Sequence, residues 1–440
     1  RNQEQANIYY ESYENAIIEV GKINLIKNKN NGVSIKISAL CPSYEMRKYE
    51  DIKLNLVPKL IALTELGMSK DVEITIDAEE QDRLGISLEI IKIMAESNKI
   101  KDWPGFGIAL QAYGKRSLDA VEWVKGLINN RGPMHLRLVK GAYWDTEIKD
   151  SQVEGYHDFP VFTQKASTDV AYQACAKKLL EYRDSIYPQF ATHNAYTAAT
   201  IIAMAGDPKE GDEWGFEFQR LHGMGESLYQ QVLTDKNIPC RIYAPVGQHN
   251  ELLAYLVRRL LENGANSSFV NNIYDEKVAI DSLLIDPVET VLNWPNKRNS
   301  SIPQAIDLYQ NEQGIKRQNS LGIDLTDNEE LLKMQAALKH WCQQNINQAP
   351  QDSRNKVYNP ANHQEVIGYI QHTDEAGMLL AVEQAKQAFT TWSQTPIQQR
   401  AHILQQIADT LGLRVETVIR AIKNLEKQKK VLIDKRKVFR

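Results

Sequence analysis

The sequence predicts an α/β fold of the (βα)8 TIM-type barrel class that lacks its first strand, and three observations lead to this prediction. Short β-branched runs alternate with longer amphipathic segments from about Val33 to Gly264, which is typical of parallel strands joined by helical crossovers. The polar residues of these runs fall on one face of each strand. No Gly-rich turn follows the first run, which disfavours an open nucleotide-binding sheet.

Seven strand candidates are visible, one fewer than a closed barrel of this type needs. They are Val33–Leu40, Val72–Ala78, Gly107–Ala112, His135–Lys140, Phe190–His193, Glu217–Leu221 and Arg241–Pro245. Helices are predicted after most of them, at Leu54–Leu66, Glu80–Glu96, Leu118–Ile128, Thr168–Tyr187 and Glu251–Asn263. Because Tyr9–Gly21 has the pattern of the first crossover helix, we expect the missing strand to precede Arg1.

A change of composition after about Pro303 predicts a linker and a second, smaller α+β unit. The stretch QAIDLYQNEQGIKRQNS is polar and rich in Gln and Asn. Beyond it we expect a helix over Leu331–Gln344, a hairpin turning at Pro360–His363, and helices over Asp374–Trp392 and Gln399–Leu411. The predicted organisation is a barrel over residues 1–300, a linker or arm over 301–345, the small unit over 346–411 and a basic tail over 412–440.

Composition favours an ordinary soluble globular protein in a reducing cytoplasm. The chain is 42% hydrophobic and 25% charged, and no run of about eighteen apolar residues offers a membrane span. A formal net charge of -4 gives no general attraction to nucleic acid. The four cysteines form no CxxC pair, so neither a metal site nor a disulfide framework is indicated. With no secretory signal and no initiator Met, the N-terminus is expected to have been cut from a longer protein.

Polar residues recur late in the predicted strands, on the face that would line the lumen. Lys36 lies opposite Ile35 and Ile37, because side chains alternate along a strand. The same alternation selects Asp77, Gln111, Arg137, Gln219, Leu221 and Tyr243. Each has a structural explanation when taken alone, such as a Lys36–Asp77 ion pair or a loop cap at Arg137. Together they predict a pocket at the end of the barrel where such enzymes carry catalytic groups.

The last predicted barrel helix, in ELLAYLVRRLLENG, carries Tyr255, Arg258 and Glu262 on one face. Arg259 lies about a quarter turn aside. Adjacent arginines usually face solvent, but these interrupt an apolar segment just after a strand. Since an Arg pair binds a carboxylate through bidentate hydrogen bonds, they predict a small carboxylic acid as ligand. His193 in ATHNA is compatible with a base, a cofactor contact or a packed histidine, and alone it favours packing.

Seven stretches carry a family resemblance: VSIKISALCPSY, TIDAEEQDRL, IALQAYGKR, LRLVKGAYWDTEI, ATHNAYT, FQRLHGMGE and IYAPVGQHNELLAYLVRRLLENGANSSF. In this order, over about residues 7–290, they resemble the proline dehydrogenase domain of the bifunctional bacterial proline utilization A family, whose members also carry a pyrroline-5-carboxylate dehydrogenase. The resemblance implies oxidation of L-proline to Δ1-pyrroline-5-carboxylate by hydride transfer to FAD, the first step of proline catabolism. It also implies a membrane quinone as electron acceptor and leaves hydroxyproline open as a substrate.

The resemblance further implies roles for individual residues. Positions that match flavin contacts are Gln111, Arg137, Val139, Lys140, Gly141, Ala142, Trp144, Thr192, His193, Asn194, Gln219 and Glu262. Positions that match the surroundings of proline are Lys36, Asp77, Tyr143, Leu221, Tyr243, Arg258 and Arg259, the arginines pairing its carboxylate. The catalytic group expected among them is Lys36, Asp77, Arg137, Tyr143 and Tyr243. Arg137 is expected to stabilise negative charge on the reduced flavin ring.

From Val357 to Leu411 the sequence resembles the N-terminal edge of aldehyde dehydrogenases, in VYNPANHQEVIGYI and AVEQAKQAFTTWSQTPIQQRAHILQQIADTL. The NAD-binding core and nucleophilic cysteine of that family have no counterpart, so aldehyde oxidation is not expected from this chain. The alternative to an active flavoprotein is an inactive or weakly flavin-binding fragment, because a barrel short of one strand exposes two strand edges. The resemblance places the protein in the cytoplasm and leaves room for peripheral contact with the inner membrane.

Overall fold

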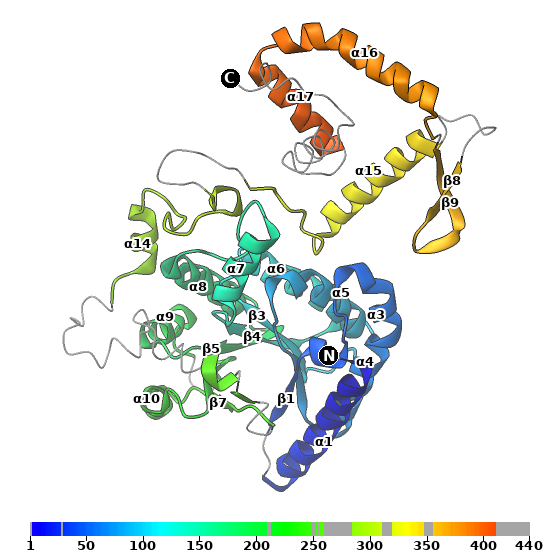
Figure 1. Cartoon of the computed structure of the whole chain (residues 1–440). Coiled ribbons are helices and arrows are strands. Elements are labelled where there is room, and N and C mark those ends of the chain that lie inside the picture. The colour runs from blue at the N-terminus through cyan, green and yellow to red at the C-terminus, as the bar shows by residue number, and fades with distance from the viewer. Residues whose placement is uncertain are drawn as a thin grey trace. The chain divides into compact units, whose positions relative to one another are not determined.

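The computed structural model describes residues 2–27, 30–208, 213–247, 252–253, 255–258, 284–309, 319–346, 355–370 and 372–410. The chain divides into two compact units, Arg1–Gln335 and Ala336–Arg440 (Figure 1). Each unit is described by itself below. Among the described helices, none combines the length and the apolar character needed to cross a membrane.

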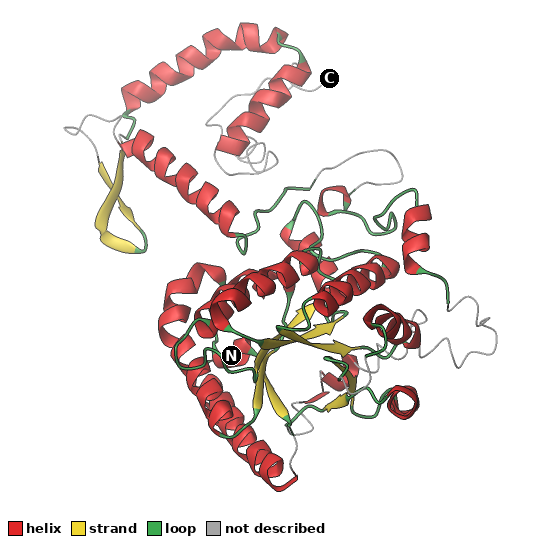
Figure 2. Ribbon diagram, turned by 180° about the vertical axis from the view of Figure 1, so that it is seen from behind, coloured by secondary structure: helices red, strands yellow, loops and turns green. Residues whose placement is uncertain are grey.

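The first unit is built around one curled sheet of seven parallel strands. They are β1 (Gly32–Ile35), β2 (Glu73–Ile76), β3 (Phe106–Gln111), β4 (Met134–Val139), β5 (Ile186–Ala191), β6 (Glu217–Leu221) and β7 (Cys240–Tyr243). Each strand pairs with the next one along the chain, and within the described residues β1 and β7 form the two edges. Figure 2 shows the curled sheet with helices outside it. The predicted α/β barrel class with seven strands is confirmed.

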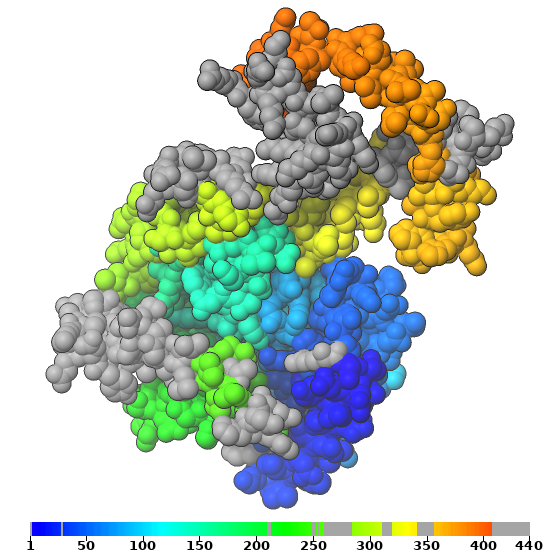
Figure 3. Space-filling model, in the orientation of Figure 1, coloured from blue at the N-terminus to red at the C-terminus, as the bar shows by residue number. Residues whose placement is uncertain are grey.

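Helices join the strands and cover the outer face of the sheet (Figure 1). They are α1 (Gln3–Lys27), α2 (Ile37–Leu40), α3 (Tyr49–Asn55), α4 (Val57–Ser69), α5 (Leu84–Ala95), α6 (Ser117–Arg131), α7 (Trp144–Glu154), α8 (Lys165–Glu181), α9 (Ala195–Ala205), α10 (Glu226–Lys236) and α14 (Pro287–Asn293). Short 3₁₀ turns lie at η1 (Met46–Lys48), η2 (Gln81–Arg83) and η3 (Ala305–Asp307). As expected for the segment around Tyr9–Gly21, α1 is a helix before β1, and Figure 3 shows it at the surface in dark blue.

Strand register explains why the sheet has one apolar and one polar face. Ile35, Ile76 and Ile108 are paired side by side on β1, β2 and β3, and all three are buried in the core beneath the helices. Burying such a side chain contributes about 1.5–3 kcal/mol to stability. Successive side chains of a strand point to opposite faces of the sheet. The side chains between these isoleucines, including those of Ser34 and Thr75, therefore point into the lumen.

The end of the first strand was predicted too far along the chain. Val33–Leu40 reads as one β-branched run, but β1 ends at Ile35 and Ile37–Leu40 forms the short helix α2. A side chain from the next strand's loop stabilises this turn, since the Glu79 carboxylate accepts a hydrogen bond from the Ser38 N–H at 2.9 Å, at the N-terminus of α2. A tertiary contact of this kind is invisible in local sequence.

Other helix limits also shift. Thr168–Tyr187 was predicted as one helix, whereas α8 ends at Glu181 and β5 begins at Ile186. Only residues 182–185 separate the two elements, and β5 itself contains Pro188 and Gln189, which interrupt the strand pattern, so periodicity gives no clear start for β5. Leu54–Leu66 is split between α3 and α4, with proline near the start of the latter. The predicted helix after β7 lies largely outside the described residues, although 252–253 and 255–258 are helical.

Part of the predicted linker is bonded to the barrel. The Gln304 Nε2 donates to the His157 carbonyl at 3.0 Å, and the Gly322 N–H donates to the Gly155 carbonyl at 2.8 Å. Gly322 fits there because a Cβ would come within 1.8 Å of a carbonyl oxygen. The described residues of this segment up to Gln335 are therefore grouped with the first unit.

The second unit contains the elements that its sequence predicts. The helix α15 (Asn328–Ile346) leads into it, followed by the antiparallel hairpin of β8 (Asn355–Asn359) and β9 (Asn362–Ile370) and by α16 (Glu375–Gln394) and α17 (Ile397–Thr410). Asp374 caps α16, because its Oδ1 accepts from the Gly377 N–H at 2.8 Å. The basic tail over 412–440 lies outside the described residues.

Candidate functional site

Arg137 of β4 joins four other parts of the sheet inside the lumen. Its Nε donates to Gln219 Oε1 on β6 at 2.7 Å, and its Nη1 donates to Ser34 Oγ on β1 at 3.0 Å. The same Nη1 lies 3.4 Å from Asp77 Oδ1, just after β2, and the guanidinium carbon lies 5.2 Å from the ring centroid of Tyr243 on β7. Buried and held by so many partners, this cation has a fixed position at the centre of the lumen.

Lys36, at the end of β1, contacts a tyrosine, and not Asp77 as the structural explanation of this residue would have it. Its Nζ donates to the Tyr143 hydroxyl at 3.0 Å. Burial acts to lower the pKa of Lys36, but the Tyr143 hydroxyl and the nearby carboxylates of Asp77 and Glu79 outweigh it, so the pKa is raised. Lys36 is therefore a cationic donor at neutral pH.

Tyr143 lies between two cations. Arg258, in the short helical stretch after β7, has its guanidinium carbon 5.4 Å from the Tyr143 ring centroid, and Lys36 contacts the Tyr143 hydroxyl. Two cations around one aromatic ring form a place suited to an anion of the size of a carboxylate. Arg259 and Glu262, the other predicted residues of this helix, lie outside the described residues.

Tyr243 remains protonated in this setting. The Asp77 carboxylate, followed by burial, raises the pKa of the Tyr243 hydroxyl far above its ordinary value, although Arg137 acts in the opposite direction. The hydroxyl can therefore donate a hydrogen bond. Tyr243 pairs with Leu221 across β6 and β7, which places both predicted proline neighbours at the same level of the lumen.

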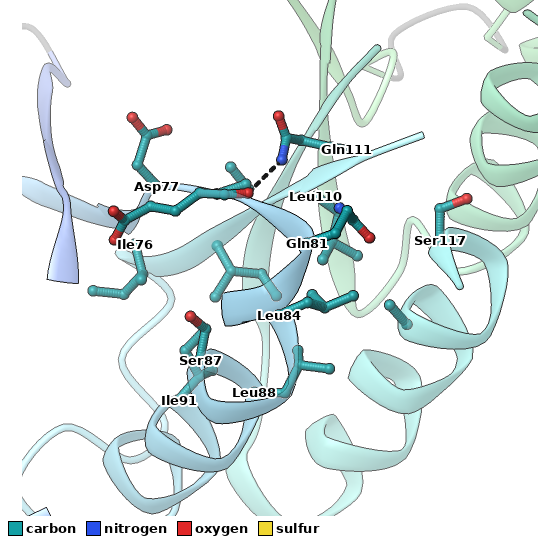
Figure 4. A pocket seen from close by; sticks show the side chains of 15 residues that line it. Ile76, Asp77, Gln81, Leu84, Ser87, Leu88, Ile91, Leu110, Gln111 and Ser117 are labelled. Atoms are coloured by element: carbon teal, nitrogen blue, oxygen red, sulfur yellow. Dashed lines mark hydrogen bonds between the residues drawn. The ribbon is translucent and has the colours of Figure 1, made fainter. Parts of the chain in front are cut away.

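Gln111 links two loops at the ends of the strands. Its Nε2 donates to the Glu79 carbonyl at 2.7 Å, the bond drawn dashed in Figure 4, and its Oε1 accepts from the Ala142 N–H at 3.1 Å. The backbone beside Gln111 is paired too, since the Ala112 N–H donates to the Val139 carbonyl at 2.8 Å. Gln111 thus links the loop after β2 to the loop after β4.

The remaining flavin-matched positions have bonds of their own. His193 Nε2 accepts from the Leu221 N–H at 3.1 Å, so this histidine joins the ends of β5 and β6. Asn194 caps α9 by accepting from the Thr197 N–H at 3.0 Å. Three further positions are also bonded: Lys140 pairs with Asp169, Thr192 Oγ1 accepts from the Asn194 N–H, and Trp144 Nε1 donates to the Phe162 carbonyl.

A small pocket beside Gln111 is too small for a cofactor. It is lined mainly by apolar residues of α5 and β3, among them Leu84, Leu88 and Leu110 (Figure 4). Its space of about 30 Å³ suits a water or two. Among the described residues, no group of three His, Cys, Asp or Glu side chains is arranged to hold a metal ion.

The opposite end of the lumen is filled by a charged network. Arg241 of β7 pairs with Glu217 at 2.7 Å and with Glu73 of β2 at 2.8 Å, and its Nη1 donates to the Asn30 carbonyl at 3.0 Å. These bonds tie one edge strand of the sheet to residues at and beside the other edge. Glu73 and Glu217 are thus paired with a cation at this end, whereas the buried Gln189 Oε1, on β5 beside Glu217, has no hydrogen-bond partner among the described residues.

Tyr13 is a site neighbour that the sequence analysis missed. It belongs to α1, yet its buried hydroxyl accepts a hydrogen bond from the Lys36 N–H at 3.0 Å. Burial raises the pKa of Tyr13, with Asp77 acting in the same direction. In the sequence, Tyr13 looks like one more aromatic residue on a packed helix, and only the charges gathered around it distinguish it.

Tyr13→Phe should therefore destabilise the protein and weaken proline use. Losing the acceptor of a buried N–H costs about 1–3 kcal/mol, and the backbone of Lys36 loses a support. Urea unfolding and the KM for proline measure the two effects. Tyr10→Phe, on the same helix and half-buried like Tyr13, is the matched control and should change stability by less than about 0.5 kcal/mol. Equal behaviour of the two variants would remove Tyr13 from the site.

Glu147 is a buried carboxyl group close to the same loops. Its Oε1 accepts from the Gln81 N–H at 2.7 Å and from the Tyr113 hydroxyl at 3.0 Å. Burial raises the pKa of Glu147 to about 7, and the carboxylates of Asp82 and Glu80 act in the same direction, while its two donors act to lower it. The group therefore titrates near neutral pH.

The stability that Glu147 contributes should accordingly fall as pH rises from about 4.5 to about 7, the window between the ordinary and the raised pKa of Glu147. In that window the unfolded chain has already lost the proton that the folded chain keeps. Glu147→Gln removes this titration, so the stability difference between parent and variant should shift by about 2 kcal/mol across the window. Urea unfolding at several pH values measures it, and a constant difference would contradict the raised pKa.

Comparison with known proteins decides the family. A family model described as proline dehydrogenase matches residues 1–272. The chain belongs to the proline dehydrogenase family. A second model, of the aldehyde dehydrogenase family, matches residues 347–434, past Leu411 where the resemblance seen in the sequence ends. The predicted combination of a proline dehydrogenase domain with part of an aldehyde dehydrogenase domain is confirmed.

Curated and solved relatives agree with this assignment. The bifunctional protein PutA of Klebsiella aerogenes is 41% identical over 435 residues, which is 94% of this chain and 33% of that protein. The Escherichia coli protein of the same name is 41% identical over 436 residues, 94% of this chain and 32% of its own length. The chain thus spans about a third of the length of these relatives.

Two crystal structures show the same architecture. A variant of proline utilization A from Bradyrhizobium japonicum superposes with a TM-score of 0.77 at 40% identity, over 93% of this chain and 39% of that one. Proline utilization A from Bdellovibrio bacteriovorus, inactivated by N-propargylglycine, has a TM-score of 0.80 at 28% identity, over 93% and 44%.

Proposed function

We propose that this chain is a flavin-dependent proline dehydrogenase that oxidises L-proline to Δ1-pyrroline-5-carboxylate, with FAD as cofactor and a membrane quinone as electron acceptor. The observation that carries the proposal is the pair of cations on Tyr143, Lys36 and Arg258, at the strand ends of a barrel of this family. Proline brings one carboxylate and one ring nitrogen, and two cations suit that carboxylate.

The donor set of the lumen fits FAD. Arg137 offers positive charge inside the lumen, and Lys140, paired with Asp169 of α8, adds a cation just past the end of β4. Gly141, whose φ is +140°, exposes bare backbone beside it. A Cβ at Gly141 would lie 2.4 Å from the Tyr113 ring, so only glycine leaves this backbone open to a ligand. Bound FAD would supply the acceptor for the hydride from C5 of proline.

The protein's own residues bind and orient the substrate. Arg258 holds the carboxylate and, by the family resemblance, Arg259 shares that role. Lys36 remains protonated and fixes the Tyr143 hydroxyl. Arg137 needs no reorganisation to favour negative charge on the reduced cofactor, because Gln219 and Asp77 already hold it in place.

The test is to purify the chain and ask what it binds and oxidises. We expect the visible absorption band of oxidised flavin, release of FAD on denaturation, and dye reduction that depends on proline. N-propargylglycine, which inactivated the Bdellovibrio relative, should abolish that activity. A colourless chain that neither takes up added FAD nor reduces dye with proline or hydroxyproline would support the alternative, an inactive fragment.

A further inference from the structure

Glu147 connects three loops that each carry a residue of the proposed site. It lies on α7, four residues after Tyr143. Its first donor, the Gln81 N–H, belongs to the turn four residues after Asp77, and its second donor, Tyr113, follows Gln111 by two residues. The loops after β2, β3 and β4 therefore meet on one carboxyl oxygen.

Within the described residues, no side-chain capping bond holds the start of α7, whose N-cap residue is Tyr143. The Tyr143 carbonyl accepts from the Glu147 N–H at 2.9 Å. Glu147 therefore contacts Tyr143 through the backbone and the neighbouring loops through its side chain, which links the position of Tyr143 to theirs.

Tyr113 strengthens the same connection. Its ring lies against Gly141, and its backbone N–H donates to the Lys140 carbonyl at 2.7 Å. The Tyr113 hydroxyl then reaches Glu147 at 3.0 Å. The segment from Lys140 to Glu147 is thus attached to Tyr113 at both of its ends.

We propose that Glu147 is a positioning residue that fixes Tyr143, through α7, against the loops after β2 and β3. Glu147 acts through Tyr143, and its effect on proline use rests on the function proposed above. A neutral acceptor of the same shape can take both hydrogen bonds, so glutamine should replace glutamate here and alanine should not.

The experiment compares Glu147→Ala, Glu147→Gln and Glu154→Gln in the full chain. Glu154 is the control, an exposed carboxylate on the same helix. In Glu147→Ala, we expect amide hydrogen exchange at Gln81 and over 140–147 to quicken about tenfold, as for one lost hydrogen bond of about 1.4 kcal/mol. The KM for proline should rise about tenfold while kcat changes about twofold or less. Glu147→Gln should match the parent.

Parent-like exchange and KM in Glu147→Ala would overturn the proposal. Should that variant fail to fold, Tyr113→Phe decides, because it keeps the ring on Gly141 and removes only one donor. Faster exchange over 140–147 with a KM raised about threefold would support the proposal, and agreement with Glu154→Gln would overturn it. If the parent chain itself does not oxidise proline, the proposed function fails, and the exchange measurements alone still decide whether Glu147 holds these loops.

Discussion

Arg258→Ala is expected to raise the KM for proline by roughly 30- to 1000-fold, because losing one donor of a partly desolvated carboxylate contact costs about 2–4 kcal/mol. The guanidinium is already placed over the Tyr143 ring at 5.4 Å. Flavin content should change much less. Steady-state kinetics with proline and the flavin absorbance per chain measure the two quantities.

Two variants, Arg258→Lys and Arg47→Ala, are the controls for this prediction. Arg258→Lys keeps the charge but loses the planar fork, so its KM should lie between those of the parent and the alanine variant. Arg47→Ala removes an exposed arginine paired with Glu45 and should leave the KM unchanged. Arg259→Ala is expected to resemble Arg258→Ala, although Arg259 lies outside the described residues. A KM within about threefold of the parent for both site variants would remove the pair from the carboxylate site.

Arg137→Met is expected to have the largest combined effect, on stability, flavin content and turnover. The substitution leaves Asp77 in the lumen without its cation, and breaking such a buried pair costs about 3–5 kcal/mol. Losing a fixed cation beside the cofactor should lower kcat by about 10²- to 10³-fold. Urea unfolding, flavin absorbance and dye reduction follow the three effects.

The double variant Arg137→Met with Asp77→Asn separates structure from catalysis. Removing the uncompensated carboxylate should restore most of the lost stability but not kcat. If turnover returns together with stability, Arg137 has a structural role alone. That outcome would contradict the role assigned to it in the proposed reaction.

The architecture could be predicted from sequence because its signal is repeated along the chain. Alternation of β-branched runs with amphipathic segments located all seven strands. The first and last residues of individual strands could not be predicted as well. The end of β1 depends on Glu79, which lies 41 residues from Ser38 in sequence, and the start of β5 is obscured by Pro188 and Gln189, which interrupt the strand pattern.

For the site, the sequence predicted which strand residues face the lumen but not which partners they contact. Period-two alternation selected Arg137, Asp77 and Gln219, and the structure places them in one hydrogen-bonded group. Partner choice could not be predicted, because Lys36 binds Tyr143 from a distant loop instead of Asp77. Residues that support the site from helices, such as Tyr13, carry no strand pattern and look like packing residues until their partners are known.

The most direct test of the proposed function is anaerobic addition of proline to the chain loaded with FAD. Loss of the visible band of oxidised flavin, with formation of pyrroline-5-carboxylate in equal amount, is the predicted result. Arg258→Ala should need far more proline for the same loss. A flavin-loaded chain whose spectrum does not change with proline, while added dithionite still bleaches it, would contradict the assignment of this site to proline oxidation.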